Sequence, residues 1–100
     1  MATIDFSKIR VGDIISLHHM WRFQDTHIVG EITRLDKDYN RLCIDGFTYR
    51  NDRLERIEFW FMDYAYVRKS QPVTREEYQL LEDIHRQKPM PESLKNKFFK

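Results

Sequence analysis

Short runs of β-branched and aromatic residues alternate with turn signals throughout residues 11–69, and no segment of helical period separates them. The turn signals are Gly12-Asp13, the polar cluster at 36–40, Asp45-Gly46 and Asn51-Asp52. Parallel strands need long crossover connections, so strands spaced this closely must pair antiparallel. We therefore predict five or six strands in a small SH3-like β-barrel or a related sandwich.

Two of the three glycines in this strand-rich region, Gly30 and Gly46, carry further predictions. Asp45-Gly46 is the strongest two-residue hairpin signal of the chain, because glycine accepts the positive φ of a tight turn. Gly30 lies within the strand-like run at 26–35, where an isolated glycine indicates a bulge or a bend. We expect a hairpin turn at Gly46 and a distorted strand at Gly30.

The chain changes to a helical period after Pro72. Thr74 and Glu77 have the spacing of a capping box, and Val73 and Tyr78 that of a hydrophobic staple. These signals predict a helix over about residues 74–87, whose apolar residues are Tyr78, Leu80, Leu81 and Ile84.

The remaining residues, 88–100, are predicted to be a basic tail or a short second helix. Pro89 would end the first helix, and Pro91 suits the first position of a second one. The chain is thus predicted to be one α+β domain, 1–100, with the barrel over about residues 11–69.

Composition and charge narrow the class of protein. Apolar residues are 41% of the chain and charged residues 33%, and the single cysteine, Cys43, excludes an internal disulfide. No apolar run approaches the roughly 20 residues of a membrane span, so we expect a cytoplasmic protein. Residues 1–85 carry 12 Lys/Arg against 15 Asp/Glu, and residues 86–100 carry 5 against 1. The basic tail alone does not supply the field needed to bind duplex DNA.

Residues with catalytic or metal-binding potential do not form a recognisable motif. Cys43 lies in a predicted strand between Leu42 and Ile44, where free cysteine usually behaves as a small hydrophobe. His18 and His19 with His27 could suggest a metal site, but adjacent residues on a strand point to opposite faces, so His18 and His19 cannot share an ion. Structural or surface histidines are favoured. No phosphate-binding loop or nucleophile elbow is present. We predict neither an enzyme, nor a cofactor, nor a metal site.

An aromatic-rich segment, IEFWFMDYAYVRK at 57–69, is the most distinctive part of the chain. Strand alternation places Ile57, Phe59 and Phe61 on the core face and Trp60, Tyr64 and Tyr66 on the other. That second face could lie beneath the C-terminal helix or contact a partner. Asp63 on the core face indicates a bulge or a strand end; the alternation would then reverse, and Trp60 would be the exposed anchor.

Large side chains with a polar group are typical of binding hot spots. The predicted binding residues are Trp60, Tyr64, Tyr66, Arg68, Trp21, Phe23, Arg50 and Arg53. For the series Arg50, Arg53 and Arg56, interleaved with acidic residues, a solvated mixed-charge face is favoured over a phosphate clamp.

Two stretches resemble a known group of proteins. Ile9-Arg10-Val11-Gly12-Asp13-Ile14-Ile15 is similar to an "LRIGN-x-V" opening, and Pro72-Val73-Thr74-Arg75-Glu76-Glu77-Tyr78-Gln79-Leu80-Leu81 to an "I-x-L-T-E-E-x-L" closing segment. Both occur in small uncharacterised proteins carried by phages and mobile elements of Bacteroidetes. The resemblance covers about residues 9–84, departs from the pattern at Arg75 and Tyr78, and implies a short β-barrel with a C-terminal helix but no functional residues.

A phage-like setting implies a role for which small non-enzymatic proteins are suited, the inhibition of host defence, as by anti-CRISPR proteins. We therefore predict a binding protein that docks on a host protein or ribonucleoprotein and inhibits or modulates it. The alternative is a module that binds single-stranded RNA or DNA. In this alternative Trp21, Phe23, Trp60 or Tyr66 stack on bases, and phosphates are contacted by Arg50, Arg53, Arg68, Lys69 and the basic tail.

Overall fold

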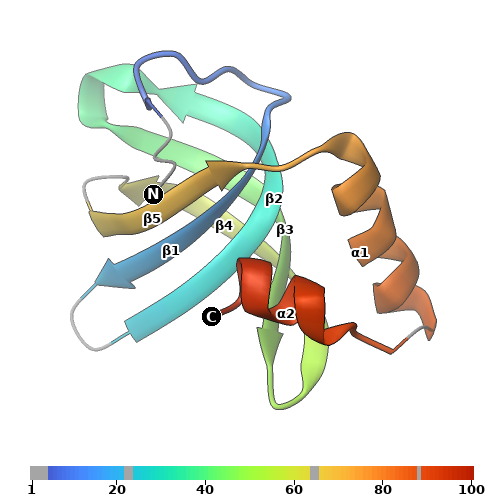
Figure 1. The fold of residues 1–100 in the computed structure, drawn as a ribbon. Helices are drawn as coiled ribbons and strands as arrows, with labels where there is room; N and C mark the ends of the chain where they lie inside the picture. Colours follow the sequence, from blue (N-terminus) through green and yellow to red (C-terminus); the bar gives the residue numbers. More distant parts are fainter. Residues whose placement is uncertain (1–4, 22–23, 64–65, 88) are drawn as a thin grey trace.

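Five antiparallel strands form a single strongly curved sheet (Figure 1): β1 (Ile14–Trp21), β2 (Gln24–Asp36), β3 (Arg41–Arg50), β4 (Arg53–Asp63) and β5 (Val67–Pro72). The computed structural model describes residues 5–21, 24–63, 66–87 and 89–100, and at residues 21, 24, 61–63 and 87 the backbone alone. The strand order is β4-β3-β2-β1-β5. Among the described residues no pairing joins β4 to β5, so the sheet is open and the predicted barrel is not confirmed.

Two helices follow the sheet, α1 (Arg75–Gln87) and α2 (Glu92–Phe98). The predicted capping box is confirmed: the Glu77 amide donates to Thr74 Oγ1 at 3.1 Å, and the Thr74 amide donates to Glu77 Oε1 at 3.0 Å. The tail is a second helix, with Pro91 at the N-cap rather than at the first helical position. Within the described chain, neither helix has the length and apolar character that crossing a bilayer requires.

The prediction of a hairpin turn at Asp45-Gly46 is wrong. Both residues lie inside β3, and Gly46 is paired with Gly30 on β2 and Ile57 on β4. A Cβ atom on Gly46 would overlap the Val29 carbonyl group, so glycine serves here for close strand approach and not for positive φ. The turn after β3 is Asn51-Asp52, where both residues have positive φ, 54° and 59°, as the hairpin geometry requires.

Of the two alternatives expected at Gly30, a bulge or a bend of the strand, the bulge is wrong. Gly30 lies in continuous register with Gly46, and the shift in β2 falls between Ile32 and Arg34. A Cβ on Gly30 would lie 2.6 Å from the Asp45 carbonyl oxygen. The two glycines therefore face each other where β2 and β3 approach most closely.

Apolar side chains are buried on both faces of the sheet. The face that we call inner carries a cluster made of Ile9, Ile15, Leu17, Ile28, Ile32, Leu42 and Ile44, with Ile57 and Phe59 packed against it. The outer face packs against the helices through Ile14, Val29, Phe47, Val73, Tyr78, Leu81, Ile84, Leu94, Phe98 and Phe99. Ile57 and Phe59 thus lie in the core as predicted. Leu80, predicted to be buried, is 40% exposed.

The helices cover only one end of the outer face. In Figure 1, α1 and α2 lie on the right, and the connection between β2 and β3, at the upper left, is far from both. This connection contains the short 3₁₀ helix η1 (Lys37–Tyr39) and the left-handed residue Asn40, with φ 54°. One end of the sheet is therefore a packed core, and the outer surface at the other end is open to solvent.

Candidate functional site

Arginine and aromatic side chains gather on the uncovered end of the outer face. We call this surface the arginine-aromatic patch, and it consists of Arg34, Tyr39, Arg41 and Trp60. Trp60 is 61% exposed, and the guanidinium carbon of Arg34 lies 5.8 Å from the centroid of its ring. The guanidinium carbon of Arg41 lies 5.3 Å from the centroid of Tyr39, which is also exposed. Both distances allow cation–π attraction, so each arginine stabilises a ring that faces solvent.

The strand register brings the patch together. Arg34 on β2 is paired with Cys43 on β3, and Cys43 is two residues from Arg41, so the three side chains share a face. The side chain of Ile32 points to the inner face, and regular alternation would point that of Arg34, two residues later, to the same face. The register shift between Ile32 and Arg34 turns Arg34 to the outer face instead, where it lies beside Trp60. Cys43, beneath these exposed residues, is buried as predicted.

Trp60 is not under a helix. The outer-face residues that pack against the helical cluster are Phe47, Tyr49 and Leu54, at the opposite ends of β3 and β4. Between the two regions Arg56 pairs with Asp45 at 3.1 Å. The exposure of Trp60 agrees with the exposed anchor expected at this position. The expected irregularity is also present, because the register of β4 shifts between Phe59 and Met62 and the strand ends at Asp63. Tyr66, which a reversed alternation would place on the core side, is 45% exposed.

The other sequence-predicted binding residues do not join this patch. Tyr66 is exposed, but its ring lies edge-on to His19 at 6.2 Å, and His19 also contacts Phe59 of the inner face. Arg50 and Arg53 flank the turn between β3 and β4, and Arg50 pairs with Glu55 at 2.9 Å. Arg68 is exposed on β5. Phe23 and Tyr64 lie outside the described residues, as does the side chain of Trp21.

The pairing of Arg50 with Glu55 and of Arg56 with Asp45 agrees with the mixed-charge face favoured for this arginine series. Sequence reasoning missed Arg34, Tyr39 and Arg41, although Tyr39 lies within the turn cluster at 36–40 and the two arginines lie close to it on either side. The signal that could have found them is the alternation of Arg and aromatic residues around this turn, but their common face depends on a bulge that has no local sequence mark.

A second group of polar side chains lies on the outer face at the β1–β2 hairpin. His18 is directly opposite His27 across the two strands, and their rings are stacked with centroids 4.1 Å apart and 8° between planes. Asp25 is two residues before His27 on the same face. Its Oδ1 is hydrogen-bonded to His18 Nε2 and lies 3.9 Å from His27 Nε2.

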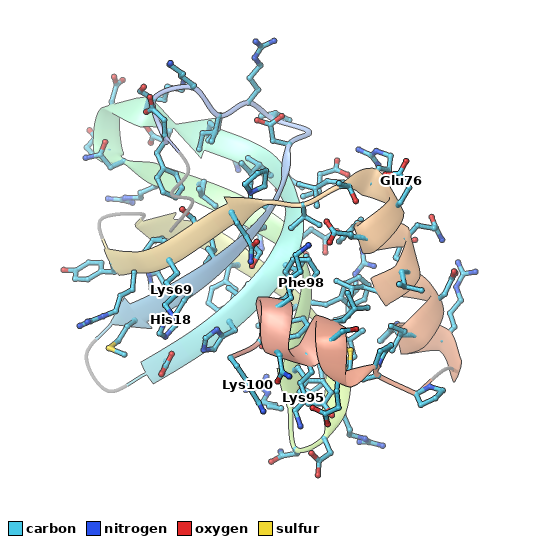
Figure 2. The ribbon with its side chains drawn as sticks, viewed as in Figure 1. His18, Lys69, Glu76, Lys95, Phe98 and Lys100 are labelled. Carbon is cyan, nitrogen blue, oxygen red and sulfur yellow. The ribbon has the colours of Figure 1, made fainter. Side chains whose placement is uncertain are left out.

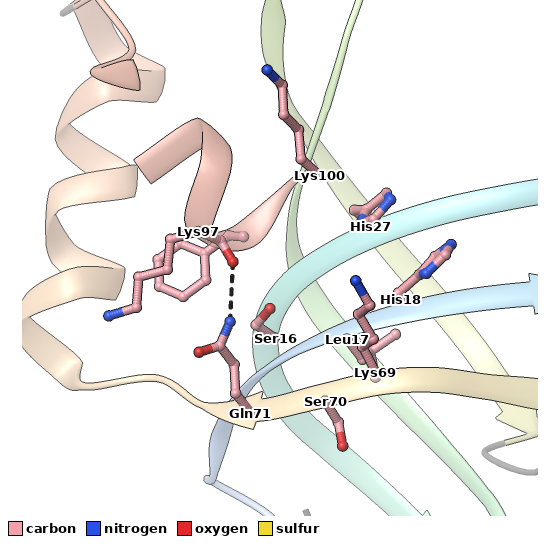
Figure 3. Close-up of a pocket in the computed structure, with 10 residues that line it drawn as sticks. Ser16, Leu17, His18, His27, Lys69, Ser70, Gln71, Lys97 and Lys100 are labelled. Carbon is pink, nitrogen blue, oxygen red and sulfur yellow. Dashed lines mark hydrogen bonds between the residues drawn. The ribbon is translucent and has the colours of Figure 1, made fainter. Parts of the chain in front are cut away.

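His18 and His27 border a pocket of about 140 Å³. Figure 3 shows their rings beside Lys69 and Lys100, which also line it. Lys69 on β5 is the register partner of His18, and Figure 2 shows the two residues on neighbouring strands. Burial lowers the pKa of His27 below its usual value, and His18 and Lys69 lower it further, against the opposing effect of Asp25. His27 is therefore neutral near pH 7.

The sequence reasoning considered His27 together with His18 and His19, and rejected a shared ion because adjacent strand residues point to opposite faces. His19 does face Phe59 on the inner side, away from His18. The reasoning missed the direct pairing of His18 with His27 across the hairpin. The pattern Asp25-x-His27 was the local signal, but its significance depends on the register of β1 against β2.

Comparison with protein-family models, with curated proteins and with solved structures finds no match for this chain. Its function is therefore argued from its own residues.

Proposed function

We propose that this chain is a non-enzymatic binding protein that docks on a protein or ribonucleoprotein through the arginine-aromatic patch. One observation carries the proposal: the Trp60 ring is 61% exposed at the end of the outer face that the helices leave uncovered, with Arg34 over it. Trp, Tyr and Arg are the residues enriched in binding hot spots. Their combination on one open surface favours a contact over a structural role.

The size of the exposed ring sets the scale of the effect. A tryptophan side chain has about 200 Å² of surface, so a partner that covers the exposed 61% of Trp60 removes about 120 Å² from water. At about 25 cal/mol per Å² this burial is worth about 3 kcal/mol, which corresponds to roughly a 100-fold change in affinity. Trp60 alone could therefore decide whether binding is detected.

The charges indicate the chemistry of the partner. Arg34 and Arg41 both lie over aromatic rings, so the patch presents cationic groups and apolar area together. Such a surface complements carboxylates set among apolar side chains. Outside the C-terminal segment 86–100 the chain is not basic, since residues 1–85 carry 12 Lys/Arg against 15 Asp/Glu. This balance favours an acidic, partly apolar protein surface over a nucleic-acid backbone.

The biological class rests on resemblance. The segments at 9–15 and 72–81 resemble those of phage and mobile-element proteins, and we propose that the chain acts in a host cytoplasm as an inhibitor of the anti-CRISPR type. At the level of fold we propose an SH3-like small barrel. The position of β5 beside β1 and an apolar cluster enclosed by the inner face support that class.

The test is affinity capture from a Bacteroidetes host lysate, followed by binding measurements with the captured protein. We expect Trp60→Ala to weaken binding about 100-fold and Arg34→Ala by about tenfold, the effect of a partly desolvated cation–π pair. Leu80→Ala is the matched control, because Leu80 is also an exposed apolar residue but lies on α1. It should leave affinity unchanged.

Equal affinity of wild type and Trp60→Ala would refute this use of the patch. Nuclease treatment before capture separates the rival function, binding of single-stranded nucleic acid. If nuclease treatment removes the captured material, and the chain binds single-stranded RNA with an affinity that falls steeply as salt rises, nucleic-acid binding replaces the protein-docking proposal.

A further inference from the structure

The cluster of His18, Asp25 and His27 combines ligand types that bind transition metals. Their ligand atoms all lie within 4.8 Å of one another. We propose that these three side chains form a site for a divalent transition-metal ion of the zinc class. The site is separate from the arginine-aromatic patch and does not depend on the docking function.

The distances suit such an ion. In a tetrahedral zinc site with bonds of about 2.0–2.1 Å, neighbouring ligand atoms are about 3.4 Å apart. His27 Nε2 and Asp25 Oδ1 are 3.9 Å apart, and the carboxylate oxygen already contacts both imidazoles. The two rings are stacked 8° from parallel, so their Nε2 lone pairs do not yet converge on one point. Binding would therefore require the imidazoles to tilt about their side-chain torsions until both nitrogens and the carboxylate oxygen face the same ion.

The backbone positions are well defined. His18 and His27 are directly paired in the β1–β2 ladder, and β5 pairs with the other side of β1. The two imidazoles are mostly buried, at 14% and 23% exposure, and the Asp25 side chain is 51% exposed. Two ligands on a rigid ladder and a third at the solvent edge would let an ion enter without opening the fold.

The ligand set selects among metals. Two imidazoles with one carboxylate suit Zn²⁺, Co²⁺, Ni²⁺ and Cu²⁺, whereas Ca²⁺ and Mg²⁺ prefer sites made of oxygen. Three protein ligands would leave a fourth position, which the adjacent pocket can supply with water or an anion. Lys69 and Lys100 line that pocket, and their charges favour a small anionic group as the fourth ligand over a neutral one.

The alternative is a metal-free hydrogen bond between a carboxylate and two histidines. It uses the same three atoms, with protons in place of the ion. Titration with metal distinguishes the two arrangements.

The experiment uses the tag-free full chain, stripped of metal with chelator, in phosphate-free buffer. Titration calorimetry with Zn²⁺ should show one ion per chain. Co²⁺ should give the visible absorption of a four-coordinate site. On addition of Zn²⁺, the imidazole nitrogen resonances of His18 and His27 should shift in NMR spectra. The resonances of His85, which lies on α1, should stay constant. Ca²⁺ and Mg²⁺ should give no signal.

Variants assign the site. His27→Gln and Asp25→Asn should each weaken Zn²⁺ binding by about tenfold or more, since even second-shell partners of metal ligands are worth 10–100-fold. Asp25→Asn keeps the shape of an exposed side chain, so it tests the site even if His27→Gln disturbs folding. His85→Gln is the matched control and should bind like wild type. No Zn²⁺ binding, or equal binding by Asp25→Asn and wild type, would overturn the proposal.

Discussion

Gly46→Ala tests the close approach of β2 and β3 at the two facing glycines, Gly30 and Gly46. A methyl group at this position would lie 2.7 Å from the Val29 carbonyl carbon and closer still to its oxygen and to Gly30 Cα. Carbon atoms in contact are about 3.5 Å or more apart, so the strands would have to separate by about 1 Å. All three atoms belong to backbone, so no side-chain rotation can relieve the overlap.

The expected cost follows from that separation. Ladder hydrogen bonds of about 2.9 Å would lengthen beyond hydrogen-bonding range, and each is worth about 1 kcal/mol. Overpacking adds about 1–3 kcal/mol, so we expect Gly46→Ala to lower the free energy of unfolding by about 3–5 kcal/mol. Since about 1 kcal/mol shifts the melting temperature of a domain of this size by roughly 4–8 °C, the midpoint should fall by more than about 12 °C.

Urea denaturation and thermal melting followed by circular dichroism would measure this change. Gly12→Ala is the matched control: Gly12 has φ +99°, and a methyl group there would meet no atom of a non-adjacent residue within 4 Å. It should cost only the backbone strain of about 1–2 kcal/mol. If Gly46 were a turn residue, as its sequence context indicates, the two variants would be equally destabilised. A Gly46→Ala protein within about 1 kcal/mol of wild type would refute the packing argument.

Three further changes test local features. Thr74→Ala should lower the free energy of unfolding by about 1 kcal/mol, measured by urea titration, because it removes the cap of α1. Asp52→Gly should raise it by up to about 1 kcal/mol, because glycine accepts the φ of 59° without strain. Burial alone would raise the pKa of Glu77, but hydrogen bonds from Lys97 and Thr74 outweigh it and lower the pKa. The stability from Glu77 should therefore be present above the ordinary glutamate pKa of about 4.3 and be lost as pH falls below it. Glu77→Gln should flatten this part of the stability profile, and an unchanged profile would contradict the assignment.

Local signals predicted the helical part of the fold well. The capping box at Thr74 and the apolar spacing after it lie within a few residues of one another, so α1 could be predicted from the sequence. Asp45-Gly46 led to a wrong turn prediction because the same dipeptide is compatible with a tight turn and with a close approach of two strands. Which of the two forms depends on the neighbouring strand. Asn51-Asp52 made the real turn with less favoured residues.

The candidate sites were harder to predict, because each depends on register. Trp60 could be identified as exposed, since Asp63 marked the end of its strand. Its partner Arg34 could not, because a bulge in β2 determines which way that side chain points. His18 and His27 are nine positions apart in the sequence, and only the alignment of β1 with β2 places them opposite each other.

The most direct test of the docking surface is site-specific photo-crosslinking in host cytoplasm. A photoreactive residue replaces Glu58, which is exposed two positions before Trp60 on β4, or Gln79, which is exposed on α1. If the arginine-aromatic patch is the binding surface, the probe at position 58 should crosslink one discrete protein. That product should disappear when Trp60→Ala is added, and the probe at position 79 should give no such product. Crosslinks of equal yield from both positions, or a product at position 58 that survives Trp60→Ala, would contradict it.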